Sequence, residues 1–379
     1  MKKVVYLFSF ILLLTLVSCS EKQKLLLLNW GEYISDEVVE KFEQTYNCDV
    51  VISLADSNEV FYSKLKSGTT VYDVVVPSDY MVEKMYKNDL LQEIDKSKLT
   101  NYNDDVFVST VKNMIKEIDL NTPGLSNYFI PYFWGTWGFM YNKSSDAYDY
   151  ILKAEKEGNP YKVFFEPNYL TSDLKVGMYE ATRYAYTASM FYNDLNINEE
   201  SDKNLEAFDK TLKSRKFNLW GTDTLKKAVS AKNLDLAYVW TGDFLDMAYT
   251  SLEEGGTFDS LGYDIYIPEK TIAFLDNLVI TKKARHVDLA HKFIDFMLDK
   301  DNARLNAKKV GYCTPIKATY NDIINYNGTE NFDKNLAFGI KKYYPLDIKN
   351  DFGFQGELLT AFDRKYITKI TNICNNSKI

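Results

Sequence analysis

Short apolar runs alternate with amphipathic stretches in the N-terminal part of the chain, and this alternation limits the fold more than any other feature. The runs Leu25–Leu28, Val50–Ser53 and Val71–Val76 have the length and composition of buried strands. Between the first two runs, the stretch from Asp36 to Tyr46 places its apolar residues on one helical face. Continuous apolar strands separated by amphipathic helices are typical of a parallel sheet covered on both faces, so we predict an α/β fold.

Aromatic and polar side chains follow two of these strands, at the point where each strand ends. Asn29–Tyr33 comes after the first strand, and Pro77–Tyr80 comes after the third. Ligands of parallel sheets lie beyond the carboxyl ends of the strands. We therefore predict that the loops Trp30–Tyr33 and Ser78–Tyr80 face one crevice.

The middle of the chain predicts a crossover and further strands. Ile130–Phe139 is an aromatic, glycine-containing extended segment, which we expect to be a hinge strand between two lobes. Residues 141–231 are predicted to be mainly helical. Leu234–Trp240, Tyr263–Ile267 and Ile272–Ile280 have the apolar composition of further strands.

The length of the chain predicts two lobes. With 379 residues, of which 46% are hydrophobic, it exceeds the size at which one core keeps growing. We expect residues 24–135 plus 275–320 to form lobe 1, and residues 136–274 plus 321–379 to form lobe 2. The cleft between two lobes is the natural binding site.

The N-terminus predicts export and a lipid anchor. Lys2 and Lys3 precede the uncharged run Val4–Leu14, which is too short to span a bilayer but suits a secretory signal. The run closes on Leu-Val-Ser-Cys, which resembles a bacterial lipobox, so we expect residues 1–18 to be a signal peptide. Cys19 would then be lipidated, with residues 19–23 as a spacer, although an ordinary cleavable signal with a chance cysteine is the alternative.

Charge, cysteine count and missing motifs exclude several classes of function. The net charge of −8 argues against nucleic-acid binding and is compatible with cationic ligands. Three cysteines follow Cys19 without a CxxC pair, so neither a disulfide framework nor a zinc site is expected. No nucleophile elbow, metalloprotease motif or phosphate loop is present, and we expect His286 and His291 to be surface residues. We therefore predict no enzymatic activity and no cofactor.

A set of aromatic and acidic residues at strand ends remains as the candidate site. Its members are Trp30, Glu32, Tyr33, Tyr80, Trp240, Asp243, Phe274, Asp276 and Tyr312. Such types suit an extended organic cation, because carboxylates bind ammonium groups and aromatic faces cover methylene segments. Structural roles are the alternative for each: a buried hydrogen-bonded carboxylate for Asp276, a helix N-cap for Asp243 and a solvated first-turn acid for Glu32.

Five segments together resemble the spermidine/putrescine-binding proteins of polyamine importers. They are Asn29–Tyr33, Tyr72–Tyr80, Ile94–Leu99, Ile130–Gly135 and Gly311–Pro315. The resemblance covers residues 24 to 320 in order. It implies the two-lobed type II periplasmic-binding-protein fold, with mixed, mostly parallel sheets and a hinge of crossing strands.

The resemblance also implies roles for individual residues. Trp30 and Tyr33 would contact the aliphatic chain of the ligand, with Glu32 on an amine and Ser78 and Tyr80 across the crevice. A second group would complete the site: Trp240 as an opposing wall, Asp276 as the acid that binds an ammonium group, and Tyr312 as a further aromatic contact.

The sequence departs from the family pattern at several positions. Phe274 stands where spermidine binders can have tryptophan. Asp173 fits the first member of an acidic pair, but Val176 stands where a glutamate is expected. The loop at Trp30 resembles the spermidine version, whereas the loop that contains Asp243 resembles the putrescine version. The glutamine expected near the C-terminus would be Gln355.

These features predict a lipid-anchored, extracytoplasmic binding protein that delivers spermidine or putrescine to the permease of an ABC importer. We expect a monomer, held at a bacterial membrane by lipid alone. Two alternatives stay open at this point: the same fold could bind another solute such as ferric ion, or it could present its ligand to a signalling receptor. Ferric ion would need oxygen donors clustered around one point.

Overall fold

The computed structural model describes residues 22–169, 174–253, 255–346 and 353–378, and it begins with the predicted alternation of strands and helices. β1 (Gln23–Asn29) pairs in parallel with β2 (Cys48–Leu54) and with β3 (Val74–Val75). The connecting helices are α2 (Asp36–Tyr46), α3 (Asn58–Ser67) and α4 (Asp79–Lys87).

The ends of α3 show how the local sequence sets these helix boundaries. At its N-terminus the Ser57 hydroxyl accepts a hydrogen bond from the Val60 amide at 3.4 Å. At its C-terminus Gly68 adopts the left-handed conformation, with φ of 64°. Serine satisfies a free amide of the first turn, and glycine takes this backbone conformation without a steric penalty.

A second group of parallel strands lies in the other half of the molecule. β6 (Val176–Tyr179) pairs with β7 (Leu219–Gly221) and with β8 (Leu236–Trp240). The helices of this half include α6 (Ala147–Lys156), α7 (Lys162–Phe165), α8 (Thr182–Tyr192), α9 (Asp202–Lys213), α10 (Asp223–Ser230) and α11 (Thr241–Leu252).

Residues 141–231 are mainly helical, as predicted, but the prediction did not include the short strands β6 and β7. β6 is short and contains Gly177, which weakens any strand signal in the sequence. A Cβ atom at Gly177 would lie 2.6 Å from the Leu225 side chain and 2.7 Å from that of Leu234. The glycine therefore permits a close approach of α10 that only the folded structure reveals.

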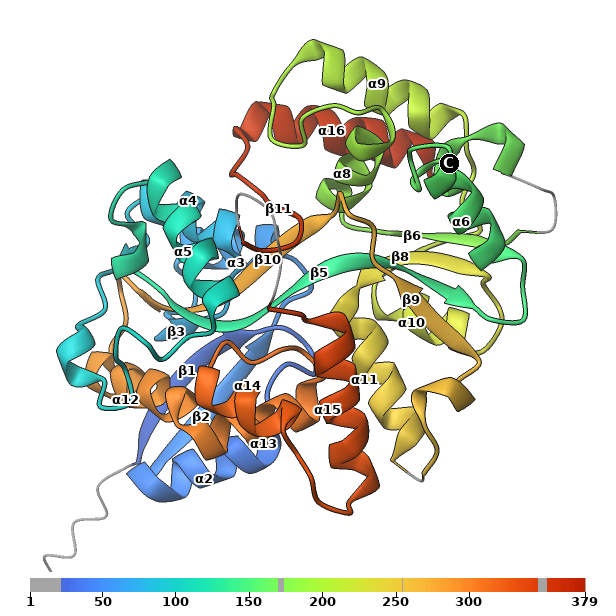
Figure 1. Ribbon diagram of the computed structural model, residues 1–379. Coiled ribbons are helices and arrows are strands. Elements are labelled where there is room, and N and C mark those ends of the chain that lie inside the picture. The colour runs from blue at the N-terminus through green and yellow to red at the C-terminus, as the bar shows by residue number, and fades with distance from the viewer. Residues whose placement is uncertain (1–21, 170–173, 254, 347–352, 379) are drawn as a thin grey trace, which may run out of the picture.

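Two long strands run between the halves, antiparallel to each other (Figure 1). β5 (Ile130–Asn142) is buried along its whole length, and β10 (Ile272–Thr281) pairs with it from Ala273 to Leu278. The ladder is interrupted by a register shift between Asp276 and Asn277. The sheet order is β2-β1-β3-β10-β5-β8-β6-β7, so β10 and β5 join the two parallel groups.

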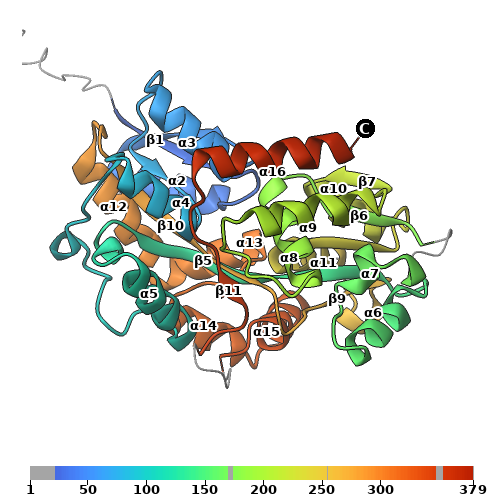
Figure 2. The ribbon, with the colours of Figure 1, turned by 90° about the horizontal axis from the view of Figure 1, so that it is seen from above.

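The remaining elements cover this framework. α5 (Ser109–Asn121), α12 (Val287–Leu298), α13 (Lys300–Val310) and α14 (Lys317–Ile324) lie with the first group of strands, and α15 (Asn331–Tyr343) packs on α11 (Figure 1). β4 (Leu91–Gln92) and β11 (Glu357–Leu358) pair with β10, and β9 (Tyr263–Tyr266) pairs with β5. The last helix, α16 (Arg364–Ser377), packs on α8 and α9 (Figure 2).

The predicted α/β class with a mixed sheet is confirmed, but the prediction that both histidines are surface residues is wrong for His291. His291 is only 3% exposed: its Nε2 accepts a hydrogen bond from the Asp95 amide, and its Nδ1 lies 2.8 Å from the Val287 carbonyl. His286 is partly buried beside Asp73. The segment around Asp95 covers this face of α12, which the spacing of two histidines cannot predict.

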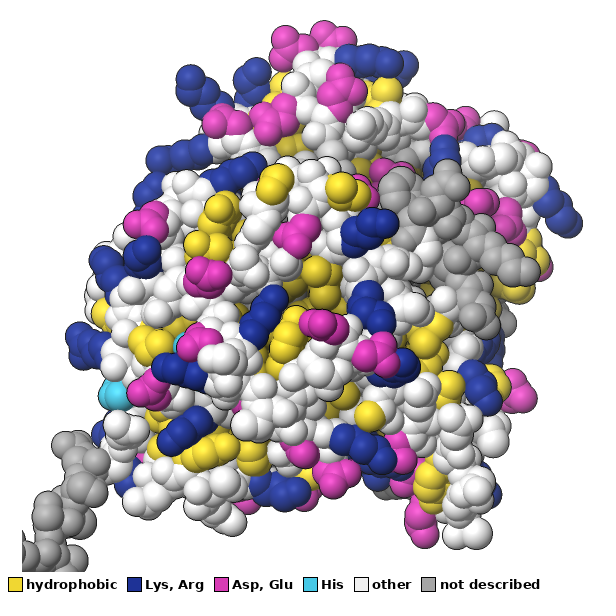
Figure 3. Space-filling model, turned by 60° about the vertical axis from the view of Figure 1, so that its left-hand side comes forward, with side chains coloured by type: hydrophobic (Ala, Val, Ile, Leu, Met, Phe, Trp, Pro, Cys, Tyr) yellow, Lys and Arg dark blue, Asp and Glu magenta, His cyan; other side chains and the backbone are white. Residues whose placement is uncertain are grey.

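Other sequence-based expectations can be compared directly with the described residues. Cys48, Cys313 and Cys374 are free and buried. None of the helices in the described ranges has the length and apolar character needed to cross a membrane. Figure 3 shows acidic and basic side chains interspersed over one face of the molecule.

Candidate functional site

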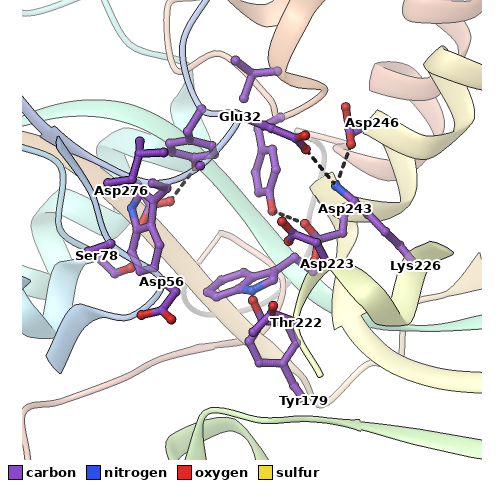
Figure 4. Close-up of a pocket in the computed structure, with 18 of the residues that line it drawn as sticks. Glu32, Asp56, Ser78, Tyr179, Thr222, Asp223, Lys226, Asp243, Asp246 and Asp276 are labelled. Atoms are coloured by element: carbon purple, nitrogen blue, oxygen red, sulfur yellow. Dashed lines mark hydrogen bonds and ion pairs between the residues drawn. The ribbon is translucent and has the colours of Figure 1, made fainter. Parts of the chain in front are cut away.

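A cavity of about 430 Å³ lies between the two parallel groups of strands. Its walls come from the carboxyl ends of β1, β2, β3, β6, β7 and β8 and the segments that follow them, from β10, and from the C-terminal end of α13 with the turn after it. The lining residues used below are Trp30, Glu32, Tyr33, Asp56, Ser78, Asp223, Lys226, Trp240, Asp243, Asp246, Asp276 and Tyr312 (Figure 4). The predicted crevice at the strand ends is therefore present.

Asp276 is a buried carboxylate held by two hydroxyl groups. It lies on β10 opposite Ser78, whose hydroxyl donates to Oδ1 at 2.6 Å, and the Tyr33 hydroxyl donates to Oδ2 at 2.6 Å. Burial raises the pKa of the Asp276 carboxyl to about 6, against the lowering effect of these two hydrogen bonds. Among the described residues, the partners of the Asp276 carboxylate are thus hydroxyl groups, and no cation offsets the cost of burying its charge.

Asp243 is a second buried carboxylate, in the first turn of α11. The Tyr312 hydroxyl donates to its Oδ1 at 2.9 Å, whereas Oδ2 is buried and has no hydrogen-bond partner among the described residues. Burial raises the pKa of Asp243 to about 7, although the positive charge of Lys226 lowers it. An unsatisfied carboxylate oxygen that lines a cavity is a ready acceptor for a donor on a ligand.

The two carboxylates are linked through their tyrosine partners. The rings of Tyr33 and Tyr312 meet edge to face, with centroids 5.0 Å apart. A Cβ atom on Gly242 would lie 2.3 Å from the Tyr312 ring, so the absence of a side chain there allows the ring to lie against α11. Asp243 and Asp276 are therefore hydrogen-bonded to two tyrosines that contact each other.

Two tryptophans supply apolar walls. Trp30 donates its indole N–H to the Val76 carbonyl at 2.8 Å and packs against Phe61 at a centroid distance of 4.6 Å. Trp240 packs against Trp137 at 4.3 Å and against Phe274 at 4.5 Å. With their rings fixed by these contacts, both tryptophans can cover the apolar part of a ligand at low entropic cost.

Glu32 points toward a lysine that the sequence did not single out. Its Oε2 lies 4.0 Å from Nζ of Lys226, and Lys226 is also 2.6 Å from Oδ2 of Asp246. The backbone of Glu32 is left-handed, with φ of 54°, an uncommon conformation that costs about 1–3 kcal/mol and is often found at ligand sites. The Glu32 carboxylate is therefore already beside an ammonium group.

Three of the predicted site residues that the structure describes do not line this cavity. Tyr80 is buried on α4, with its hydroxyl 3.4 Å from Glu59. Phe274 lies behind Trp240 and supports it. Gln355 donates to the Pro268 carbonyl, away from the cavity residues. Asp173 lies outside the described residues.

The departure at Val176 has a structural counterpart. Val176 is fully buried in β6 and pairs with Leu236 of β8. Its side chain is not part of the cavity wall. The acidic side chains of this half that reach the cavity come instead from α10, at Asp223, and from α11, at Asp243 and Asp246.

The arrangement of the acidic side chains is relevant to the alternative that the fold binds ferric ion. In the described ranges, no group of three or more histidine, cysteine, aspartate or glutamate side chains is arranged to hold a metal ion. The cavity acids are instead distributed among aromatic rings and around Lys226 (Figure 4).

Comparisons with known proteins place these features in a family. The model of the family described as bacterial extracellular solute-binding protein matches residues 28–304. The spermidine/putrescine-binding periplasmic protein of Salmonella typhimurium is 30% identical over 78% of this chain and 78% of its own length. A putrescine/cadaverine-binding protein of Pseudomonas aeruginosa is 26% identical over 77% of this chain and 79% of its own.

A solved structure agrees with the fold. The spermidine/putrescine ABC transporter substrate-binding protein PotD of Streptococcus pneumoniae is 26% identical and superposes with a TM-score of 0.68. The match covers 94% of this chain and 99% of that one. The predicted type II periplasmic-binding-protein fold is thereby confirmed.

Proposed function

The chain belongs to the family of bacterial extracellular solute-binding proteins, which are binding proteins and not enzymes, and we propose that its ligand is a short aliphatic polyamine. One observation carries the proposal: Asp243 and Asp276 are buried carboxylates that line one cavity, and no cation among the described residues contacts either of them. The relatives whose names include spermidine, putrescine or cadaverine support the same ligand class.

The physical argument rests on compensation of buried charge. A buried carboxylate is costly unless it is paired, and an ammonium group can form charge-assisted hydrogen bonds of about 1.5–3 kcal/mol each. Two ammonium groups joined by methylenes would satisfy both acids. The indoles of Trp30 and Trp240 would cover the methylenes and add about 0.5–2 kcal/mol by cation–π contact.

We propose that the two halves of the molecule are the predicted lobes, 24–135 plus 275–320 and 136–274 plus 321–379. β5 and β10 would form the hinge between them. A ligand that contacts acids of both halves has a higher affinity for the closed form, and only this difference can drive closure. The closed form would be recognised by the permease of an ABC importer.

Three further predictions from the sequence belong to this proposal. Cys19 would carry the lipid anchor, residues 1–18 would be removed, and the protein would act as a monomer on the periplasmic or cell-surface side of a bacterial membrane. The family is periplasmic or extracellular, which supports the compartment. Cys19 itself lies outside the described residues.

Calorimetric titration tests the ligand class. The purified full chain, freed of bound ligand by unfolding and refolding, is titrated with putrescine, cadaverine, spermidine and spermine. We expect one-to-one binding of at least one of them. Butylamine is the matched control, since it has the carbon chain of putrescine with one ammonium group, and it should bind at least about tenfold more weakly. No heat and no thermal shift with all four polyamines would overturn the proposal.

A further inference from the structure

Lys226 is a buried cation inside the candidate cavity. It lies on α10, and only 4% of its surface is exposed. Its ammonium group forms an ion pair with Asp246 at 2.6 Å from one half of the molecule and approaches Glu32 at 4.0 Å from the other (Figure 4). A buried lysine is rare unless it is paired, so this position is defined by the acids around it.

Asp56 and Asp223 lie at exposed positions of the cavity, and its other four acids fall into two groups by their partners. Asp246 and Glu32 lie beside the Lys226 ammonium. Asp243 and Asp276 are bonded to hydroxyl groups only, and within the described part of the chain no lysine or arginine contacts either of them. Two buried carboxylates of the cavity thus have no cation among the described residues, whereas the neighbouring pair of acids, Asp246 and Glu32, already has the Lys226 ammonium.

Lys226 is also electrostatically coupled to the uncompensated acids. Burial lowers the pKa of its ammonium group, but the negative charges of Asp243 and Asp246 outweigh this and raise the pKa. Lys226 therefore stays charged at neutral pH. An ammonium group of a ligand that bound near Asp246 would meet a like charge.

We infer that Lys226 determines specificity: its ammonium group occupies the position beside Asp246 and Glu32 that the third amine of a triamine would need, so the cavity selects a diamine. This inference rests on the proposed function. The unpartnered oxygen of Asp243 and the hydroxyl-bonded carboxylate of Asp276 are the two buried acidic positions that Lys226 leaves for ligand amines. Methylenes between them would run along the tyrosines that support both acids.

Replacement of Lys226 by methionine provides the test. Methionine keeps an unbranched apolar side chain and removes the charge, so Asp246 and Glu32 become free for an amine of the ligand. In calorimetric titrations of the full chain at pH 8, the unmodified protein should bind putrescine more tightly than spermidine. Lys226→Met should raise the ratio of spermidine to putrescine affinity at least about tenfold, the effect of one charge-assisted bond.

Two control variants separate specificity from general electrostatics. Lys227→Met removes the same charge from the adjacent, exposed position on α10 and should leave the ratio unchanged. Lys226→Arg keeps a cation at the buried position and should keep the preference for the diamine. Thermal unfolding of each variant checks that the fold is retained.

The outcomes distinguish this inference from the proposal on which it rests. If the unmodified protein binds no polyamine, the proposed function is overturned and this inference with it. If it binds polyamines but prefers spermidine, the inference alone fails, and this result needs no variant. An unchanged ratio in a folded Lys226→Met variant also refutes the role of Lys226 and leaves polyamine binding intact.

Discussion

Lowering the pH from 8 to 6 should weaken diamine binding about 20-fold. Burial raises the pKa of Asp243 to about 7 and that of Asp276 to about 6 in the ligand-free protein. A protonated carboxyl cannot pair with an ammonium group, so affinity is fully present above both pKa values and is lost as the pH falls through them.

The magnitude follows from the two pKa values. Each acid weakens binding by a factor of 1 + 10^(pKa − pH), which is about 11 for Asp243 and about 2 for Asp276 at pH 6. At pH 8 the product of the two factors is close to 1. The difference is about 20-fold, or about 1.8 kcal/mol.

Calorimetry measures this effect in two independent ways. Putrescine affinity is determined at pH 6, 7 and 8, and proton release is determined at pH 6.5 in buffers of different ionisation enthalpy. About one proton should be released per ligand, because the protonated fractions of the two acids sum to about one at that pH.

Variants identify the responsible group. Asp243→Asn should reduce the pH effect to about twofold, since of the two buried cavity carboxylates Asp276 alone then titrates in this range. Asp56→Asn is the matched control, because it removes one negative charge from an exposed position of the same cavity and should leave the pH effect unchanged. Equal affinity at pH 6 and 8, or an undiminished pH effect in Asp243→Asn, would refute the reasoning.

Three further variants test the site. Asp276→Asn removes a charge-assisted bond and should weaken putrescine binding at least tenfold, about 1.5 kcal/mol or more by calorimetry; unchanged affinity would remove this residue from the site. Trp240→Ala should weaken all polyamines to a similar degree, because an apolar wall does not count charges, and an effect on one polyamine alone would contradict that role. Gly242→Ala would place a methyl group 2.3 Å from the Tyr312 ring and should lower both the melting temperature and polyamine affinity. Gly262→Ala, whose nearest neighbouring atom would be 4.0 Å away, is its control and should bind normally.

The strand ends and their acids could be predicted from the sequence because their signals are local. The apolar runs at Leu25–Leu28 and Val71–Val76 indicate buried parallel strands, and the loops that follow such strands share one edge of a sheet. Asp276 was conspicuous as a carboxylate inside an apolar run. The sequence pattern does not reveal the hydrogen-bond partners of that carboxylate, which the structure shows to be Ser78 and Tyr33.

Lys226 could not be assigned because its role depends on tertiary contacts. It is one of two adjacent lysines on a short amphipathic helix, and composition does not distinguish Lys226 from Lys227. A weak signal was available, since Lys226 precedes the buried Val229 by three residues and thus lies on the same side of the helix. The acids that bury it, Glu32 and Asp246, come from segments far away in the sequence.

The interrupted ladder between β5 and β10 has a mechanical consequence. A two-stranded ribbon is stiff within the plane of its hydrogen bonds and more pliable across that plane, and a bulge lowers its stiffness locally. The register shift falls between Asp276 and Asn277, so the softest point of the ribbon coincides with a carboxylate of the cavity. A cation bound at Asp276, together with the hydroxyl groups of Ser78 and Tyr33, would stiffen the ribbon at this point. Asp276 would thus affect both the affinity for the ligand and the resistance of the ribbon to bending.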